Sequence, residues 1–364
     1  MADAAAGLQA RIYTIRKGKK VPFRMDYGER SNCSGLDGKG MQKRQLGNGP
    51  LEVSELSFGT WLTIAGGIER QRAIQCIHAA LDHGITLFDT ANQYGAGEAE
   101  RVLGEALKAY PRDSYLIATK LFFPVGEEPD HGLSASQIEK QLNRSLERLG
   151  VDTIDLYQCH RYDKETPLDE TMEALDRVVR TGKVRAIGFS EWTADQIDAA
   201  ARITETDGLT AFTSSQPQYS MLWRTPEDKV LPACARLGIG NLAFSPLAHG
   251  VLTGKYAPGQ PPPPGSRAAN EQMNLFMETA GRHYRSDYLL KAVVQLKPIA
   301  ADLGLTMTQM ALAWVLRRPG VASAIIGASR PEQIEENVHA VGIALPAEAL
   351  ARIDEVLSSV VVKA

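Results

Sequence analysis

Short apolar runs alternate with amphipathic segments from residue 56 to near the end of the 364-residue chain. The runs carry few charges and do not alternate between polar and apolar residues, which is typical of parallel strands covered on both faces. The pattern therefore predicts eight buried strands, at residues 56–61, 87–91, 115–120, 154–160, 184–190, 212–219, 241–247 and 322–328.

Segments with apolar residues at helical spacing lie between these runs. Three of them begin with a capping-box pattern, in which Ser134, Thr193 and Thr306 are each followed three residues later by glutamine. Glycines such as Gly84 and Gly150 follow the expected helix ends. The predicted helices span residues 69–83, 97–109, 134–149, 169–181, 193–203, 226–237 and 306–317.

Eight strands that alternate with helices predict an α/β fold, the (β/α)8 TIM barrel, whose chemistry lies at the carboxyl ends of the strands. The long interval between strands 7 and 8 predicts an enlarged insertion, with a Pro/Gly-rich loop at 257–265 and an extra helix around 286–303. An open doubly wound sheet is the alternative fold. It is disfavoured because no G-x-G-x-x-G motif follows the first strand.

Residues 1–40 show little periodicity and contain the basic run RKGKK at 16–20. We expect this segment to be a flexible N-terminal extension in which the basic run is solvated, ahead of a barrel domain at 41–364. The four cysteines, Cys33, Cys76, Cys159 and Cys234, form no C-x-x-C pair. Neither a disulfide framework nor a metal site is therefore predicted.

The net charge is −3, so no overall field favours nucleic acid. No apolar run approaches the roughly 18 residues of a membrane span, and no secretory leader is visible. We expect a cytoplasmic protein with no nucleic-acid partner and no membrane insertion.

Four residues at or just beyond strand ends form the main candidate site: Asp89, Tyr94, Lys120 and His160. A positive charge beside a phenol favours the ionised form and so lowers the phenol pKa, and a neighbouring carboxylate keeps the amine charged. Alone, each residue has an ordinary reading, such as a strand cap, a loop aromatic or a core histidine. Together they are suited to protonating a carbonyl oxygen.

A second candidate site follows the last strand, where Gly327, Ser329 and Arg330 precede a helix that opens at Pro331. Free backbone N–H groups at a helix start bind anions. A hydroxyl and a guanidinium there suit an adenosine 2′-phosphate. The alternative is local, because Ser329 and Glu332 also match a capping box and Arg330 could be solvated.

From about residue 41 onward the chain resembles the aldo-keto reductases, in particular the branch of potassium-channel β-subunit-like reductases. The motifs that carry the resemblance lie in order at predicted strand ends. They are FDTANQYG (88–95), IATK (117–120), LYQCHR (156–161), IGFSEW (187–192), SPLAHGVLTGKY (245–256) and IIGASRPEQIEENVHA (325–340).

The resemblance implies that Tyr94 is the general acid, that Lys120 and Asp89 tune it, and that His160 orients the substrate carbonyl. It also implies that NADPH/NADP+ is the cofactor, with Tyr219 stacked on the nicotinamide ring. The implied cofactor residues are Thr60, Trp61, Asp89, Ser190, Gln216, Tyr219, Ser245, Pro246, Leu247, Ala248, Gly250, Leu252, Lys255, Arg267, Gly327, Ser329, Arg330, Gln333, Glu336 and Asn337.

We therefore expect NADPH-dependent reduction of a small aldehyde or ketone, with no metal and with Trp61, Tyr94, Phe122, His160 and Trp192 around the substrate. Family resemblance implies a homo-oligomer, a tetramer. One alternative is a regulatory subunit that binds NADPH as a redox signal with weak or no turnover. His160 argues against that reading, because the animal channel subunits depart from histidine there. Another alternative is a lyase or isomerase on the same barrel, which would not bind NADPH.

Overall fold

The computed structural model describes residues 13–16, 19–22, 40–61, 64, 67–125, 130–278 and 283–363, with only the backbone at 13–16, 19–22, 271, 272, 275 and 276. The chain divides into two units, Met1–Gly38 and Lys39–Ala364. In the first unit, β1 (Tyr13–Arg16) pairs antiparallel with β2 (Lys19–Pro22). The sequence analysis did not predict this hairpin. The expected flexibility of the extension falls largely on residues outside those described.

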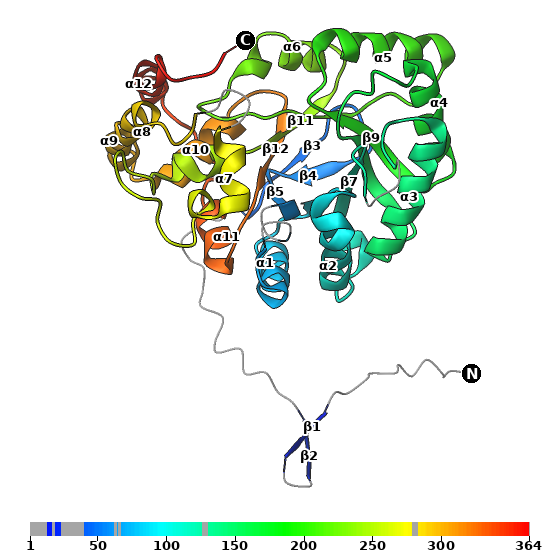
Figure 1. Ribbon diagram of the computed structural model, residues 1–364, viewed down its shortest axis with the longest axis horizontal. Coiled ribbons are helices and arrows are strands. Elements are labelled where there is room, and N and C mark those ends of the chain that lie inside the picture. Colours follow the sequence, from blue (N-terminus) through cyan, green and yellow to red (C-terminus); the bar gives the residue numbers. More distant parts are fainter. Residues whose placement is uncertain are drawn as a thin grey trace, which may run out of the picture. The chain divides into compact units, whose positions relative to one another are not determined.

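Eight parallel strands close into a barrel in the second unit, in chain order from β5 to β12, which confirms the predicted (β/α)8 fold (Figure 1). The predicted run at 212–219 is a strand over only three residues. The barrel strands are β5 (Leu56–Gly59), β6 (Leu87–Asp89), β7 (Leu116–Leu121), β8 (Ile154–Cys159), β9 (Val184–Ser190), β10 (Ser214–Gln216), β11 (Gly240–Phe244) and β12 (Val321–Ile326).

Helices surround the barrel (Figure 1). All seven predicted helices form, but α6 begins later than expected because Pro226 lies in a separate 3-10 turn, Thr225–Glu227. The helices are α1 (Arg70–Asp82), α2 (Glu98–Leu107), α3 (Ala135–Leu149), α4 (Leu168–Arg180), α5 (Ala194–Asp207), α6 (Val230–Arg236), α7 (Glu271–Glu278), α8 (Asp287–Val294), α9 (Leu296–Asp302), α10 (Met307–Leu316), α11 (Pro331–Val338) and α12 (Ala347–Leu357).

The insertion between β11 and β12 contains α7, α8 and α9, so the extra helix expected around 286–303 is two helices. The break is at Gln295, and Pro298 lies in the first turn of α9, where a missing N–H is tolerated. Two capping boxes form as predicted, at Thr193 and Thr306. The third was wrong, because the Ser134 side chain makes no cap hydrogen bond and its Oγ lies 3.2 Å from the Ser136 hydroxyl.

A hairpin that was not predicted, β3 (Lys43–Gln45) with β4 (Glu52–Ser54), lies at the amino end of the barrel. Its Leu46, Leu51 and Val53 are buried in the same cluster as the inward-facing strand residues, including Leu87 and Leu156. The turn contains Gly47 at φ 59, where a Cβ would lie only 2.4 Å from the Gly238 carbonyl oxygen. The hairpin therefore packs tightly against the strand starts and fills that end of the barrel.

Two further findings bear on the sequence predictions. Cys76, Cys159 and Cys234 are buried free thiols, as expected for small core residues, whereas Cys33 lies outside the described residues. Within the described ranges, no single helix is long and apolar enough to cross a membrane. Two helical segments taken together, Asp287–Asp302 and Met307–Leu316, are long and apolar enough, but an 88° bend separates them.

Candidate active site

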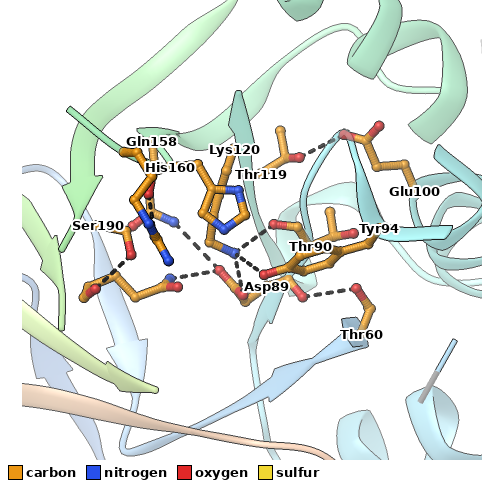
Figure 2. Close-up of polar contacts among 12 residues, drawn as sticks. Thr60, Asp89, Thr90, Tyr94, Glu100, Thr119, Lys120, Gln158, His160 and Ser190 are labelled. Carbon is orange, nitrogen blue, oxygen red and sulfur yellow. Dashed lines mark hydrogen bonds and ion pairs between the residues drawn. The ribbon is translucent and has the colours of Figure 1, made fainter. Parts of the chain in front are cut away.

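Lys120 is the centre of the site, and its side chain is fully buried at the carboxyl end of β7. Its ammonium donates to Asp89 Oδ2 at 2.6 Å and to the Thr90 carbonyl at 2.8 Å. It also lies 3.4 Å from the Tyr94 hydroxyl (Figure 2). One cation thus links a carboxylate to a phenol, as the sequence predicted from strand ends alone.

Strand register explains why these groups meet. Asp89 pairs with Ala118 across β6 and β7, and Lys120 pairs with Gln158 across β7 and β8. Tyr94 follows β6 on a tight turn in which Gly95 and Ala96 adopt left-handed conformations. The same turn is tied to β7 by a hydrogen bond from the Asn92 amide to the Lys120 carbonyl, at 3.1 Å. The phenol is therefore held over the lysine by backbone contacts.

The second carboxylate oxygen of Asp89 is held by amides. Gln216 Nε2 donates to Asp89 Oδ1 at 2.8 Å, and Gln158 Nε2 lies 3.5 Å from the same atom. Gln158 was missed in the sequence, although its position two residues before His160 should have placed both on one face of the strand. Its Oε1 is buried and has no hydrogen-bond partner among the described residues, so this polar atom is available to a bound molecule.

Burial has the largest effect on the Tyr94 phenol and raises its pKa above the ordinary value, while the charge of Lys120 opposes this shift. The expected direction of the lysine effect is thus correct, but the net direction was wrong. For Lys120, burial lowers the pKa and the Asp89 carboxylate and Tyr94 more than offset it, so the pKa is raised. At neutral pH the site therefore holds a protonated phenol beside a charged amine.

His160 lies beside the phenol, with ring centroids 5.8 Å apart in an edge-to-face arrangement (Figure 2). Burial, together with the cations of Lys120 and Arg161, lowers the pKa of His160 well below its usual value. The imidazole is therefore neutral at neutral pH. Its Nδ1 is buried without a hydrogen-bond partner in the described part of the chain, and Phe123 packs against the ring at 5.1 Å.

The predicted phosphate site at the start of α11 is arranged differently from a capping box. The Ser329 backbone N–H and hydroxyl both donate to Gln333 Oε1, at 2.7 and 3.1 Å. Arg330 is the N-cap residue without a side-chain cap bond, and its exposed guanidinium lies 3.9 Å from Glu332. Gln333 thus occupies the backbone donor that the sequence analysis assigned to an anion, and the guanidinium faces solvent.

The loop after β11 has an unusual backbone. Ser245, Ala248 and His249 all have positive φ, at 53°, 46° and 57°, and Gly250 follows at 90°. Non-glycine residues rarely adopt this conformation, and clusters of them mark functional sites. Desolvation, together with the cations of Arg267 and Arg330, lowers the pKa of Lys255 at the end of the loop. Three predicted cofactor cations therefore share one electrostatic environment.

Two predicted contacts are not supported by this geometry. Tyr219 is fully buried, donates to Glu227 at 2.5 Å and packs on Trp314, so it presents no face for stacking on a nicotinamide. Trp192 is 2% exposed and stacks on Phe189 in the outer core.

Phe244, which the sequence analysis missed, is a better candidate than Tyr219 for the aromatic residue beside a nicotinamide ring. It ends β11, packs against the inner barrel cluster and remains only partly buried.

Two more of the predicted residues, Ser190 and Thr60, hydrogen-bond to residues of the site. Ser190 donates to the Gln216 carbonyl at 2.8 Å, and Thr60 donates to the Asp89 carbonyl at 3.2 Å (Figure 2). Phe122 is partly buried against Phe123, with ring centroids 5.1 Å apart. Of the other predicted cofactor residues, four are buried, namely Pro246, Ala248, Leu252 and Asn337. Trp61, Leu247 and Gly327 are half-buried, and Glu336 is exposed.

Among the described residues, no group of three or more His, Cys, Asp or Glu side chains could hold a metal.

Comparison with known proteins shows the family of this chain. A probable voltage-gated potassium channel subunit beta of Arabidopsis thaliana is 39% identical over 324 residues, which cover 88% of this chain and 97% of that protein. A protein of the same description from Oryza sativa subsp. japonica is 37% identical over the same shares. A putative one from Schizosaccharomyces pombe is 39% identical over 88% of this chain and 94% of its own length. Residues 55–358 match the aldo/keto reductase family, and the chain belongs to that family.

Proposed function

We propose that this protein reduces aldehydes or ketones to alcohols with NADPH, using Tyr94 as the general acid. The observation that carries the proposal is the contact chain from Asp89 through Lys120 to the Tyr94 hydroxyl. NADPH, when bound, supplies the hydride. The Tyr94 phenol gives its proton to the carbonyl oxygen, and the Lys120 ammonium stabilises the phenolate that develops. The neutral His160 imidazole donates a hydrogen bond that orients the carbonyl.

The residues of the loop after β11 fit a dinucleotide. Arg267 Nε is buried without a hydrogen-bond partner in the described ranges, which is a costly state for a charged donor unless an anion completes it. The neighbouring Lys255 and Arg330 add positive charge. Gly250 has φ 90, which favours glycine, and a Cβ there would lie 3.0 Å from Lys255 Nζ. Guanidinium groups suit phosphate oxygens.

Binding and turnover together test the proposal. The full-length protein is titrated with NADPH by fluorescence, and NADPH absorbance is followed with a panel of small aldehydes, ketones and sugars. We expect saturable binding and aldehyde-dependent oxidation of NADPH. Binding without turnover on any of these carbonyls would reject the enzymatic proposal, and absence of binding would favour a lyase or isomerase.

Arg330→Ala tests the cofactor choice. Only NADPH carries the 2′-phosphate, so the variant should lose about 10-fold in NADPH affinity, near the lower end for a charge-assisted contact because this guanidinium remains solvated. Its NADH affinity should stay within about 2-fold, since NADH offers the guanidinium no phosphate to lose. Equal losses for the two cofactors in fluorescence titrations would show that Arg330 does not contact that phosphate.

A second candidate function is a regulatory subunit that binds NADPH as a redox signal. The descriptions of the Arabidopsis, rice and fission-yeast relatives as channel β subunits favour it. The complete proton-transfer set around Tyr94 favours the enzyme instead. The two functions differ in turnover, since a regulatory subunit would bind NADPH and oxidise it slowly or not at all.

A further inference from the structure

His249 is a buried histidine that the proposed chemistry does not use. It follows β11 in the left-handed part of the loop, at φ 57, and is 8% exposed. Non-glycine residues seldom adopt such a backbone, although histidine, like asparagine, is enriched among those that do. Its ring centroid lies 6.4 Å from that of Trp61, edge-on, and 5.6 Å from that of Tyr284, at a tilt of 50°. These two ring contacts hold the side chain in one place.

The hydrogen bonds of the ring define its tautomer. Arg267 Nη1 lies 2.5 Å from His249 Nδ1, and a guanidinium can only donate, so Nδ1 must be the unprotonated acceptor. The proton of the neutral ring is then on Nε2, where it can be donated to the Ser245 hydroxyl at 3.4 Å. His249 thus bridges the end of β11 to Arg267.

Arg267 contacts two rings in different ways. Its guanidinium lies 5.0 Å from the centre of the Trp61 ring, with His249 on its Nη1. Burial lowers its pKa to about 10, with Tyr256 opposing. No carboxylate in the described ranges forms an ion pair with it, and the nearby charges of Lys255 and Arg330 are also positive. A buried guanidinium held by a neutral imidazole keeps its full charge for an external anion.

We propose that His249 is the positioning residue for Arg267, holding its guanidinium through Nδ1 so that the remaining donors meet the phosphate bridge of the dinucleotide. This inference rests on the proposed function, because it assumes that a dinucleotide binds. It assigns the 2′-phosphate to a different cation, Arg330. Loss of His249 should therefore weaken NADPH and NADH equally, whereas loss of Arg330 weakens NADPH alone.

Two substitutions separate the hydrogen bond from the backbone conformation. His249→Asn and His249→Gly both relieve the positive φ. Only asparagine keeps an acceptor at the same distance along the side chain, because its Oδ1 takes the place of Nδ1. We expect His249→Asn to bind NADPH within about 2-fold of the wild type. His249→Gly should bind NADPH and NADH about 5- to 10-fold more weakly, the factor expected for one hydrogen bond.

A double-mutant cycle tests whether His249 acts through Arg267. NADPH dissociation constants are measured for wild type, His249→Gly, Arg267→Met and the double variant. If the effect passes through Arg267, adding His249→Gly to Arg267→Met should change affinity by less than about 2-fold. Fully additive losses, or equal affinities of His249→Gly and His249→Asn, would overturn the inference.

A measurement without cofactor keeps the test independent of the proposed function. In the ¹⁵N-labelled free protein, the imidazole signals lost in His249→Asn should have the shifts of the Nε2–H tautomer. The Nδ1–H tautomer would contradict the assigned contact. A wild type that binds neither NADPH nor NADH would instead reject the proposed function, whatever the tautomer.

Discussion

Two buried ion pairs lie on either side of β7, and they differ in what surrounds them. Facing the helices, Arg148 donates to Glu100 Oε2 at 2.6 Å and Thr119 donates to Oε1 at 2.6 Å, so both carboxylate oxygens are satisfied. Facing the barrel mouth, Lys120 pairs with Asp89 at 2.6 Å and also reaches a phenol (Figure 2). Residues 119 and 120 are adjacent, so one strand serves both pairs.

The difference lies in the neighbouring polar atoms. Around the Lys120–Asp89 pair, buried Gln158 Oε1, Thr90 Oγ1 and His160 Nδ1 have no hydrogen-bond partner among the described residues. Thr119 and Ser145, whose hydroxyls bond to the Glu100–Arg148 pair, have no such atom. Buried polar groups left incomplete reduce stability, so they persist where a bound molecule completes them. A buried charge pair alone therefore does not mark a site, and the Lys120–Asp89 pair differs from the Glu100–Arg148 pair in the three incomplete groups that border it.

Tyr94→Phe should have the largest effect on turnover. The proton donor is lost while the residues around the cofactor stay unchanged, so carbonyl reduction should fall about 10³-fold, within the range for general acid catalysis. NADPH affinity should remain within about 2-fold, since the cradle residues are untouched. The measurement is single-turnover reduction together with an NADPH titration. Retention of more than about a tenth of the wild-type rate would remove Tyr94 from its role.

Lys120→Met should lower reduction about 100-fold, because the developing phenolate loses its cation. The pH dependence has a defined sign. Lys120 lowers the Tyr94 pKa, so its removal raises that pKa further. Alcohol oxidation requires the phenolate, so its rate increases as pH rises through the Tyr94 pKa. In Lys120→Met this increase should occur at higher pH. If pH–rate profiles show the increase at the same pH in both proteins, the coupling between Lys120 and Tyr94 is contradicted.

Arg148→Met is the matched control with the smallest expected effect on turnover. It also breaks a buried pair and leaves a buried carboxylate, so unfolding free energy should fall by about 3 kcal/mol, as for other broken buried pairs. Turnover of the folded protein should stay within about 3-fold, since Glu100 faces away from the phenol. Denaturant titration and turnover at one temperature give both values. A large loss of turnover without loss of stability would erase the distinction between the two pairs.

Sequence reasoning predicted the barrel well because eight apolar strands and their helices are local patterns, and it brought Asp89, Tyr94, Lys120 and His160 together because parallel strands end at one edge. It did not predict the β3–β4 hairpin, since its residues are few and make their contacts far along the chain. Tyr219 was misplaced because sequence does not show which way a side chain turns after a three-residue strand. The direction in which the Tyr94 pKa shifts depends on how deeply the phenol is buried, and the sequence does not show this.

The β3–β4 hairpin determines where small molecules can enter the barrel. Leu46, Leu51 and Val53 fill its amino end, and the strands close its sides. The interior therefore opens only at the carboxyl ends of the strands. In the proposed reaction, the carbonyl compound would enter and the alcohol would leave through this same opening. The proton that would replace the one given by Tyr94 would arrive there too, because Lys120 behind it is fully buried. The proposed cycle would therefore require the alcohol to leave before the next carbonyl compound enters.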